Sequence, residues 1–168
     1  YKYSLQDVAE PNLHRDVYSY GTIPKVAFNH RRVPMAMPEE IWITDTSLRD
    51  GQQSVEPYSV DQIVNIYKLL NKLGGPYGII RQTEFFIYSK KDREAIEKCM
   101  ELDLKFPEIT TWIRASKEDF KLARDMGIRE TGILVSCSDY HIFKKMKMSR
   151  KQVLEHYLTA VSEAFEAG

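Results

Sequence analysis

The sequence predicts an α/β fold because short apolar segments alternate four times with longer amphipathic segments. The connections between them are short, so consecutive strands are expected to be parallel and joined by right-handed crossovers. Four such strand–helix units make the first half of a TIM (β/α)8 barrel, for which roughly 250 residues are usual. An open doubly wound sheet is the alternative arrangement.

Each predicted element carries its own local signal. The strands are expected at 40–46, 78–87, 108–114 and 130–137, where β-branched and apolar residues gather. Each of the four helices is preceded by a serine that can cap its first turn. Glycines at 74–75 and 127 mark the ends of the first and third helices. The capping serines are Ser59, Ser89, Ser116 and Ser149.

Residues 1–38 lack a regular period and hold four of the seven prolines, so we predict an N-terminal extended arm with a hairpin around Tyr20-Gly21. Residues 39–168 form the predicted partial barrel, which stops before a fifth strand. The sequence begins with Tyr1 and not Met, so we expect a chain that is processed or truncated at its start. The bare face of a half-barrel must be covered by the remainder of the barrel or by a second half, and we expect a homodimer.

The composition excludes several classes of protein. The formal net charge is zero, which argues against nucleic-acid binding, and we interpret the short basic run His30-Arg31-Arg32 as solvated. No apolar run is long enough to span a bilayer, so no membrane partner is expected. Cys99 and Cys137 form no C-x-x-C pair and fit reduced thiols in a cytoplasmic protein. Cys99 falls among the apolar positions of a predicted helix and is expected in the core.

Polar side chains follow the ends of the predicted strands. The carboxyl ends of parallel strands share one face, and barrel enzymes take their catalytic groups from that face. Simpler interpretations exist, such as an ion pair of Glu84 with Arg81 or Arg114, or a surface position for His141. Together these residues indicate an anion-binding, metal-assisted site. They are Asp45, Arg49, Asp50, Gln82, Glu84, Arg114, Ser136, Ser138, Asp139 and His141.

The segment Asp-Thr-Ser-Leu-Arg-Asp-Gly-Gln-Gln at 45–53 closely resembles the signature that ends the first strand of the DRE-TIM metallolyases, the HMGL-like superfamily. A second segment, from Ser136 to Ser149, is similar to the region after the fourth strand in that superfamily. This second match favours the acyl-CoA-using synthases and lyases over the biotin-dependent carboxyltransferases. The resemblance covers 40–168 and is nearest to 2-isopropylmalate synthase and homocitrate synthase.

The resemblance also implies roles for individual residues. It implies that Asp50 ligates a divalent metal, that Arg49 stabilises an enolate or oxyanion, and that Glu84 orients Arg49 or the attacking group. It implies substrate contacts for Gln53, Arg114, Ser138 and His141.

The activity implied by the resemblance is a Claisen-like condensation of acetyl-CoA with a 2-oxo acid, of the 2-isopropylmalate synthase type in leucine biosynthesis. The implied cofactor is Mg, Mn or Zn. An acyl-CoA lyase, a biotin-dependent carboxyltransferase and a non-catalytic half-barrel that binds a partner are the alternatives.

Two departures from the superfamily pattern stand out. The superfamily uses a His-x-His pair to complete its metal site, and this sequence has none. For that reason we expect the 168-residue chain to be inactive alone. In addition, Gln52 occupies a position where many of the synthases have Glu, which leaves the subclass open.

Overall fold

The computed structural model describes residues 27–28, 31–32 and 38–168, and the chain divides into two compact units, 1–40 and 41–168. In the first unit, β1 (Ala27–Phe28) pairs antiparallel with β2 (Arg31–Arg32). Two residues of the basic run therefore belong to a strand. The hairpin predicted around 20–21 and most of the predicted arm lie outside the described residues.

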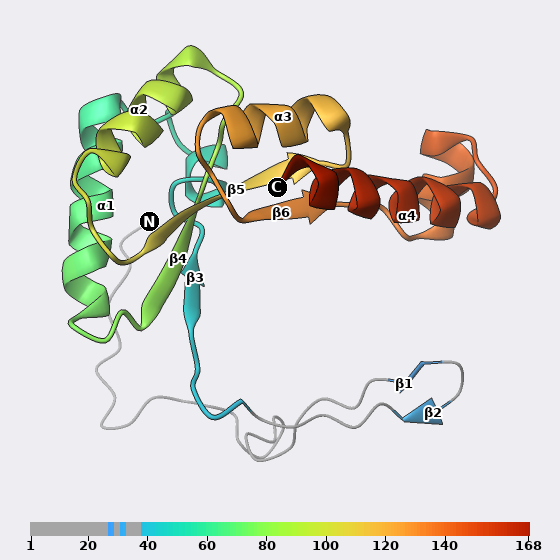
Figure 1. The fold of residues 1–168 in the computed structure, drawn as a ribbon, viewed down its shortest axis with the longest axis horizontal. Helices are drawn as coiled ribbons and strands as arrows, with labels where there is room; N and C mark the ends of the chain where they lie inside the picture. Colours follow the sequence, from blue (N-terminus) through green and yellow to red (C-terminus); the bar gives the residue numbers. More distant parts are fainter. Residues whose placement is uncertain (1–26, 29–30, 33–37) are drawn as a thin grey trace, which may run out of the picture. The chain divides into compact units, whose positions relative to one another are not determined.

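The second unit contains a parallel sheet whose strand order, β3-β4-β5-β6, follows the chain order, with helices on its outer side (Figure 1). The strands are curled into a half-barrel, which confirms the predicted α/β fold and the first half of a TIM barrel. The strands are β3 (Ile43–Asp45), β4 (Ile80–Phe85), β5 (Glu108–Arg114) and β6 (Thr131–Leu134). The helices are α1 (Val60–Gly74), α2 (Lys90–Met100), α3 (Lys117–Asp125) and α4 (Arg150–Ala167).

Three strands are shorter than the sequence predicts. The second was expected over 78–87 and spans Ile80–Phe85. The first was expected from residue 40, but Ile41 and Trp42 are 67% and 59% exposed and precede β3. The fourth was expected to continue to residue 137. It ends at Leu134 because its partner strand β5 ends at Arg114, which is paired with Leu134. A strand continues only while a neighbour supplies hydrogen-bond partners.

The predicted helix starts are confirmed. In each of the four helices the preceding serine side chain accepts the backbone N–H of the third helical residue. In α1, α2 and α4 the side chain of that third residue also bonds back to the serine N–H, which completes a capping box. In α3 the third residue is Asp119, and its carboxylate turns toward Arg114 instead.

The core lies between the strands and the helices, and α4 contributes Ala160 to it. Cys99 is 1% exposed and belongs to it, as predicted, and both cysteines are free thiols. Among the described residues, no helix has the combined length and apolar character that a membrane span requires. The most deeply buried large side chains include Leu48, Ile63, Phe85, Ile87, Ile96 and Ile113.

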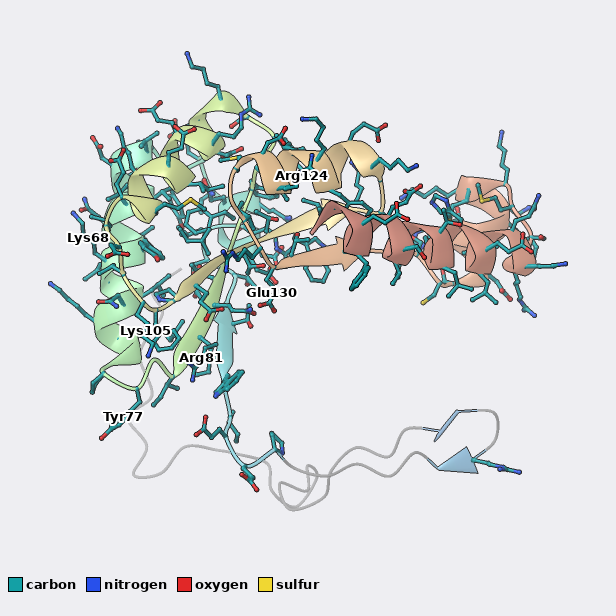
Figure 2. All side chains as sticks on the ribbon, in the orientation of Figure 1. Lys68, Tyr77, Arg81, Lys105, Arg124 and Glu130 are labelled. Carbon is teal, nitrogen blue, oxygen red and sulfur yellow. The ribbon has the colours of Figure 1, made fainter. Side chains whose placement is uncertain are left out.

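Arg81 lies in β4 and is labelled in Figure 2. Its guanidinium carbon lies 4.3 Å from the centroid of the Trp42 ring and 4.2 Å from that of Phe106. These distances are in the range of cation–π contacts. Arg81 therefore joins the segment before β3 to the loop before β5, and the sequence-based alternative of an Arg81–Glu84 ion pair is not what the structure shows.

Candidate active site

The loop after β3 is fixed by short-range hydrogen bonds. The Thr46 carbonyl accepts the N–H groups of Arg49 and Gly51, and the 3-10 turn η1 (Asp50–Gln53) follows. The Asp45 carboxylate accepts the N–H and hydroxyl of Ser47 and, at 3.2 Å, the hydroxyl of Thr83 in β4. Asp45 therefore ties the loop to the neighbouring strand, which is a positioning function.

Gln52 fixes the same loop from inside. Its side chain is buried, the amide nitrogen donates to the Leu48 carbonyl, and the amide oxygen accepts the Tyr58 N–H at 2.9 Å. Both halves of the amide are used, one as donor and one as acceptor. A carboxylate could serve only the second bond, so the departure from Glu at this position has a local structural reason.

Arg49, Asp50 and Glu84, which the sequence places at two strand ends, come together. The Arg49 Nε donates to Glu84 Oε2 at 2.6 Å, and Nη1 donates to Asp50 Oδ1 at 2.8 Å. The side chains of Arg49 and Glu84 are only 15% and 10% exposed, whereas that of Asp50 is 47% exposed. Charge-assisted bonds of this length in a partly buried setting hold the guanidinium in one orientation.

Trp112 supports Arg49 from β5. The guanidinium carbon of Arg49 lies 4.9 Å from the centroid of the Trp112 ring. Trp112 is paired with Gly132 in β6, and a Cβ at Gly132 would lie 2.1 Å from a carbon of the Trp112 ring. Only glycine leaves room for the indole there. The sequence signal for this contact was a glycine inside a strand, which often marks a close approach of another group.

A cavity of about 480 Å³ opens beside these residues. It brings together three of the predicted site residues, Arg49, Gln53 and Arg114. Two arginines and no carboxylate line it in the described part of the chain. The carboxylates paired with these arginines offset their charge, but the unused N–H groups can still bind an anionic ligand. The remaining lining residues are Phe86, Tyr88, Trp112, Ile113 and Leu134.

Arg114 is held by Asp119, a residue whose role the sequence analysis missed. The Arg114 Nε and Nη2 donate to the two oxygens of Asp119 at 2.9 and 2.8 Å, and the Arg114 backbone N–H donates to Oδ2 at 3.1 Å. The Tyr88 hydroxyl donates to the same Oδ2 at 2.8 Å. The Arg114 hydrogen bonds hold the pKa of Asp119 below its usual range, and burial together with Asp119 raises the pKa of Tyr88.

Ser138 and His141 form a separate cluster beyond β6. The Ser138 hydroxyl lies 3.1 Å from His141 Nδ1 and accepts the His141 N–H, at the start of the π-helical turn η2 (His141–Met146). Neither residue lines the cavity described above. Asp139 and Ser136 are also engaged locally, with the Arg150 guanidinium and the Tyr157 hydroxyl. Of the seven residues to which the resemblance gives a role, the structure therefore brings five together. Ser138 and His141 lie apart from them.

The part of the chain that the structure describes does not make a complete metal site. Asp50 offers a half-exposed carboxylate whose Oδ1 already accepts from Arg49. Carboxylate oxygen suits a hard divalent cation, but such a cation needs several protein or water ligands. Within the described ranges, no group of three or more His, Cys, Asp or Glu side chains is placed to hold a metal. Asp50 can therefore supply one ligand of a set that the described residues do not complete.

The parallel half-barrel, with an arginine–carboxylate cluster at its strand ends, has the architecture of the first half of a (β/α)8 barrel. The family model described as HMGL-like matches residues 40–168, and the chain belongs to this family. The membership predicted from the 45–53 segment is thereby confirmed.

Three relatives show where in the family the chain falls. It is 54% identical over its whole length to the citrate (Re)-synthase of Clostridium kluyveri and 51% identical over its whole length to that of Syntrophus aciditrophicus. It is 38% identical over 98% of its length to the 2-phosphinomethylmalate synthase of Streptomyces hygroscopicus. The chain spans 37%, 27% and 38% of these relatives, respectively.

Proteins named 2-isopropylmalate synthase and homocitrate synthase match at lower identity, 30% and 29% in two examples. All of these relatives are named as synthases. They do not show the 2-isopropylmalate specificity that the sequence analysis predicted.

Proposed function

We propose that the polypeptide containing this chain condenses acetyl-CoA with a 2-oxo acid and, more narrowly, with oxaloacetate to form citrate. The observation that carries the proposal is Arg49, fixed by Glu84 at the edge of a cavity that contains a second arginine. The identities of 54% and 51% to proteins named citrate (Re)-synthase support the narrower choice.

The chemistry needs charge stabilisation at one oxygen atom. A base removes a proton from the methyl group of acetyl-CoA, and the resulting enolate carbon attacks the 2-oxo carbon to form a C–C bond. Negative charge then moves to the carbonyl oxygen, and hydrolysis of the thioester by water releases CoA. Arg49 has unused N–H groups for that oxygen, and Glu84 fixes their direction before the substrate arrives.

The other predicted residues have supporting roles in this proposal. Gln53 and Arg114 line the cavity and contact the 2-oxo acid, while Ser138 and His141 serve the acyl-CoA side. When bound, a divalent metal (Mg, Mn or Zn) supplies the charge that polarises the 2-oxo carbonyl. Asp50 would be one of its ligands.

A 2-isopropylmalate synthase is the second candidate. Its support is the family itself and the apolar part of the cavity wall, formed by Phe86, Trp112 and Leu134, which could accept an isopropyl group. An acyl-CoA lyase or a carboxyltransferase would use the same arginine and carboxylates with other substrates. The cytoplasmic location and the homodimer expected from the sequence stay predictions.

The test is CoA release, followed with a thiol reagent, by the natural polypeptide at the length its source makes. We expect release from acetyl-CoA with oxaloacetate and a divalent metal, and little release with 2-oxoisovalerate. A preference for 2-oxoisovalerate would select the second candidate. Cleavage of a 3-hydroxyacyl-CoA, or dependence on biotin, would select the lyase or the carboxyltransferase.

Asp50→Ala should abolish CoA release. Asp125→Ala is the matched control, because Asp125 is also 47% exposed and also paired with a basic side chain, but lies at the end of α3 and is paired with Lys121 and not with Arg49. Equal rates in the wild type and Asp50→Ala would refute the proposed site.

A further inference from the structure

Arg114 combines exposure with an unusually complete set of restraints. Its side chain is 71% exposed, yet two guanidinium nitrogens and the backbone N–H of the same residue all bind one carboxylate. That carboxylate, on Asp119, is 4% exposed and so cannot move into solvent with its partner. These bonds restrict a long side chain that would otherwise sample many rotamers.

Tyr88 completes this arrangement from the loop after β4. Its hydroxyl donates to Asp119 Oδ2, and its ring centroid lies 5.3 Å from the guanidinium carbon of Arg114. Tyr88 and Arg114 both line the cavity that Arg49 borders. The fixed guanidinium is therefore part of the cavity wall.

The guanidinium retains donors for a ligand. Arginine has five N–H donors, and the bonds to Asp119 use those on Nε and one on Nη2, so three remain on Nη1 and Nη2. Two neighbouring N–H groups match the two oxygens of a carboxylate. Arg49 is the poorer receptor for a second carboxylate, since it is 15% exposed and already bound to Glu84 and Asp50.

We propose that Asp119 and Tyr88 are positioning residues that hold Arg114 as the receptor for the second carboxylate of a dicarboxylic 2-oxo acid. The inference rests on the proposed function for its substrate class. It explains how the same family site could distinguish a dicarboxylic substrate from one with an apolar side chain, because a second carboxylate can pair with the fixed guanidinium and an apolar group cannot.

If only charge mattered, Asp119 would weaken the binding of an anion to Arg114, which is the opposite of the proposed effect. A carboxylate next to Arg114 cancels much of its charge and weakens its attraction for an anion. If charge decides, Asp119→Asn should tighten the binding of a dicarboxylate. If position decides, the same change should weaken it, because the guanidinium must then be ordered at the expense of binding free energy.

A purely structural role makes a third prediction. The negative charge of Asp119 lies in the first turn of α3, where it stabilises the helix. In that case Asp119→Asn should lower the free energy of unfolding and leave substrate affinity unchanged. A control for this effect is Glu163→Gln, which removes the partner of Lys117, the first residue of α3, away from the cavity.

The experiment measures KM and kcat for oxaloacetate in the CoA-release assay, using the natural-length polypeptide. Isothermal titration with malate, a dicarboxylate that cannot condense, gives the affinity without turnover. We expect Asp119→Asn to raise KM and the malate Kd about tenfold with kcat nearly unchanged. Tyr88→Phe should raise both about threefold, and Glu163→Gln should change neither. With pyruvate, which has no second carboxylate, Asp119→Asn should not raise KM.

Each outcome decides the matter. Unchanged or tighter malate binding by Asp119→Asn, or an equal loss in Glu163→Gln, overturns the proposal. If Asp119→Asn does not fold, Tyr88→Phe decides by the same criterion, since it removes one hydroxyl only. Suppose that the wild type binds malate and the variants change the malate Kd as expected, but no 2-oxo acid supports CoA release. The proposed function then fails and the positioning role stands. If the wild type neither binds malate nor releases CoA, both fail.

Discussion

The Nε of Arg49 lies 2.6 Å from a carboxylate oxygen of Glu84, although the two residues are 35 positions apart in the chain. The parallel pairing of β3 with β4 brings them together, because Asp45 is in register with Thr83, the residue before Glu84. The hydrogen bond from Thr83 to Asp45 fixes the same register through side chains. The loop that carries Arg49 is therefore positioned by the neighbouring strand as well as by its own turn.

Glu84→Gln should lower kcat for CoA release by about 100-fold or more, the size of effect seen when one oxyanion donor is lost. The amide keeps the size of the side chain and one acceptor, but not the charge that fixes the Arg49 guanidinium. The matched control is Glu94→Gln, which breaks an exposed pair with Lys98 and should leave kcat unchanged. A wild-type kcat in Glu84→Gln would show that Arg49 is positioned by other contacts.

Gln52→Glu should destabilise the protein at neutral pH by about 1–3 kcal/mol, because a buried carboxylate would face the Leu48 carbonyl oxygen without a proton to donate. Protonation of the new side chain restores a donor, so the deficit should shrink as the pH falls from about 6.5 toward about 4.3. Urea unfolding at pH 7.5 and pH 4.5 measures both values.

The control for this change is Gln62→Glu. The Gln62 side-chain oxygen only accepts the Ser59 N–H, and a capping box takes Glu as readily as Gln. We expect no loss of stability there at pH 7.5. Equal effects at the two positions would mean that the donor half of the Gln52 amide is unimportant.

The half-barrel, the helix starts and the arginine–carboxylate cluster could all be predicted from the sequence. The spacing of apolar residues and the capping serines are local signals that the sequence shows directly. Parallel strands must in addition place their carboxyl ends on one face. The approach of Arg49, Asp50 and Glu84 to one another follows from that rule and from their positions after two neighbouring strands. Their roles in catalysis stay predictions.

The side-chain choices behind the site could not be predicted in the same way. The spacing from Ser116 predicts that Asp119 takes part in capping α3, and its backbone N–H does bond to the Ser116 hydroxyl. No local pattern shows that the Asp119 carboxylate bonds to Arg114 and not to the Ser116 N–H. The separation of Ser138 and His141 from the cavity depends on where β6 stops, which is set by the end of β5 and not by the residues of β6. Both results arise from tertiary pairing rather than from local spacing.

Gly132→Ala should destabilise the protein by about 1–3 kcal/mol, because overpacking must displace the Trp112 ring. The displacement also removes the contact between Trp112 and Arg49, so kcat should fall in the same variant. Trp112→Leu in the Gly132→Ala background should recover part of the stability and none of the activity. If the losses of unfolding free energy in the two single variants simply add in the double variant, the Gly132→Ala side chain does not clash with Trp112.

Above pH 9 the protein should lose stability through two buried groups, Cys99 and Tyr67. Burial raises the pKa of the Cys99 thiol to about 12 and is the main cause that raises the pKa of Tyr67 to about 12. Both are neutral when protonated, and in the unfolded chain they ionise near about 8.5 and 10. Their contribution is therefore complete below pH 8.5 and is lost progressively as the pH rises toward 12, at up to about 1.4 kcal/mol per pH unit for each group.

Urea unfolding between pH 7 and pH 11 measures this loss. Cys99→Ala should flatten the first part of the decline, from pH 8.5 to 10, even though it lowers the stability at pH 7 by removing a packed side chain. The control is Cys137→Ala, since the Cys137 thiol is exposed and should carry no such dependence. In the native wild type an alkylating reagent at pH 8 should modify Cys137 and spare Cys99. Rapid modification of Cys99, or the same pH dependence in Cys99→Ala as in the wild type, would contradict a thiol sealed in the core between α2 and the strands.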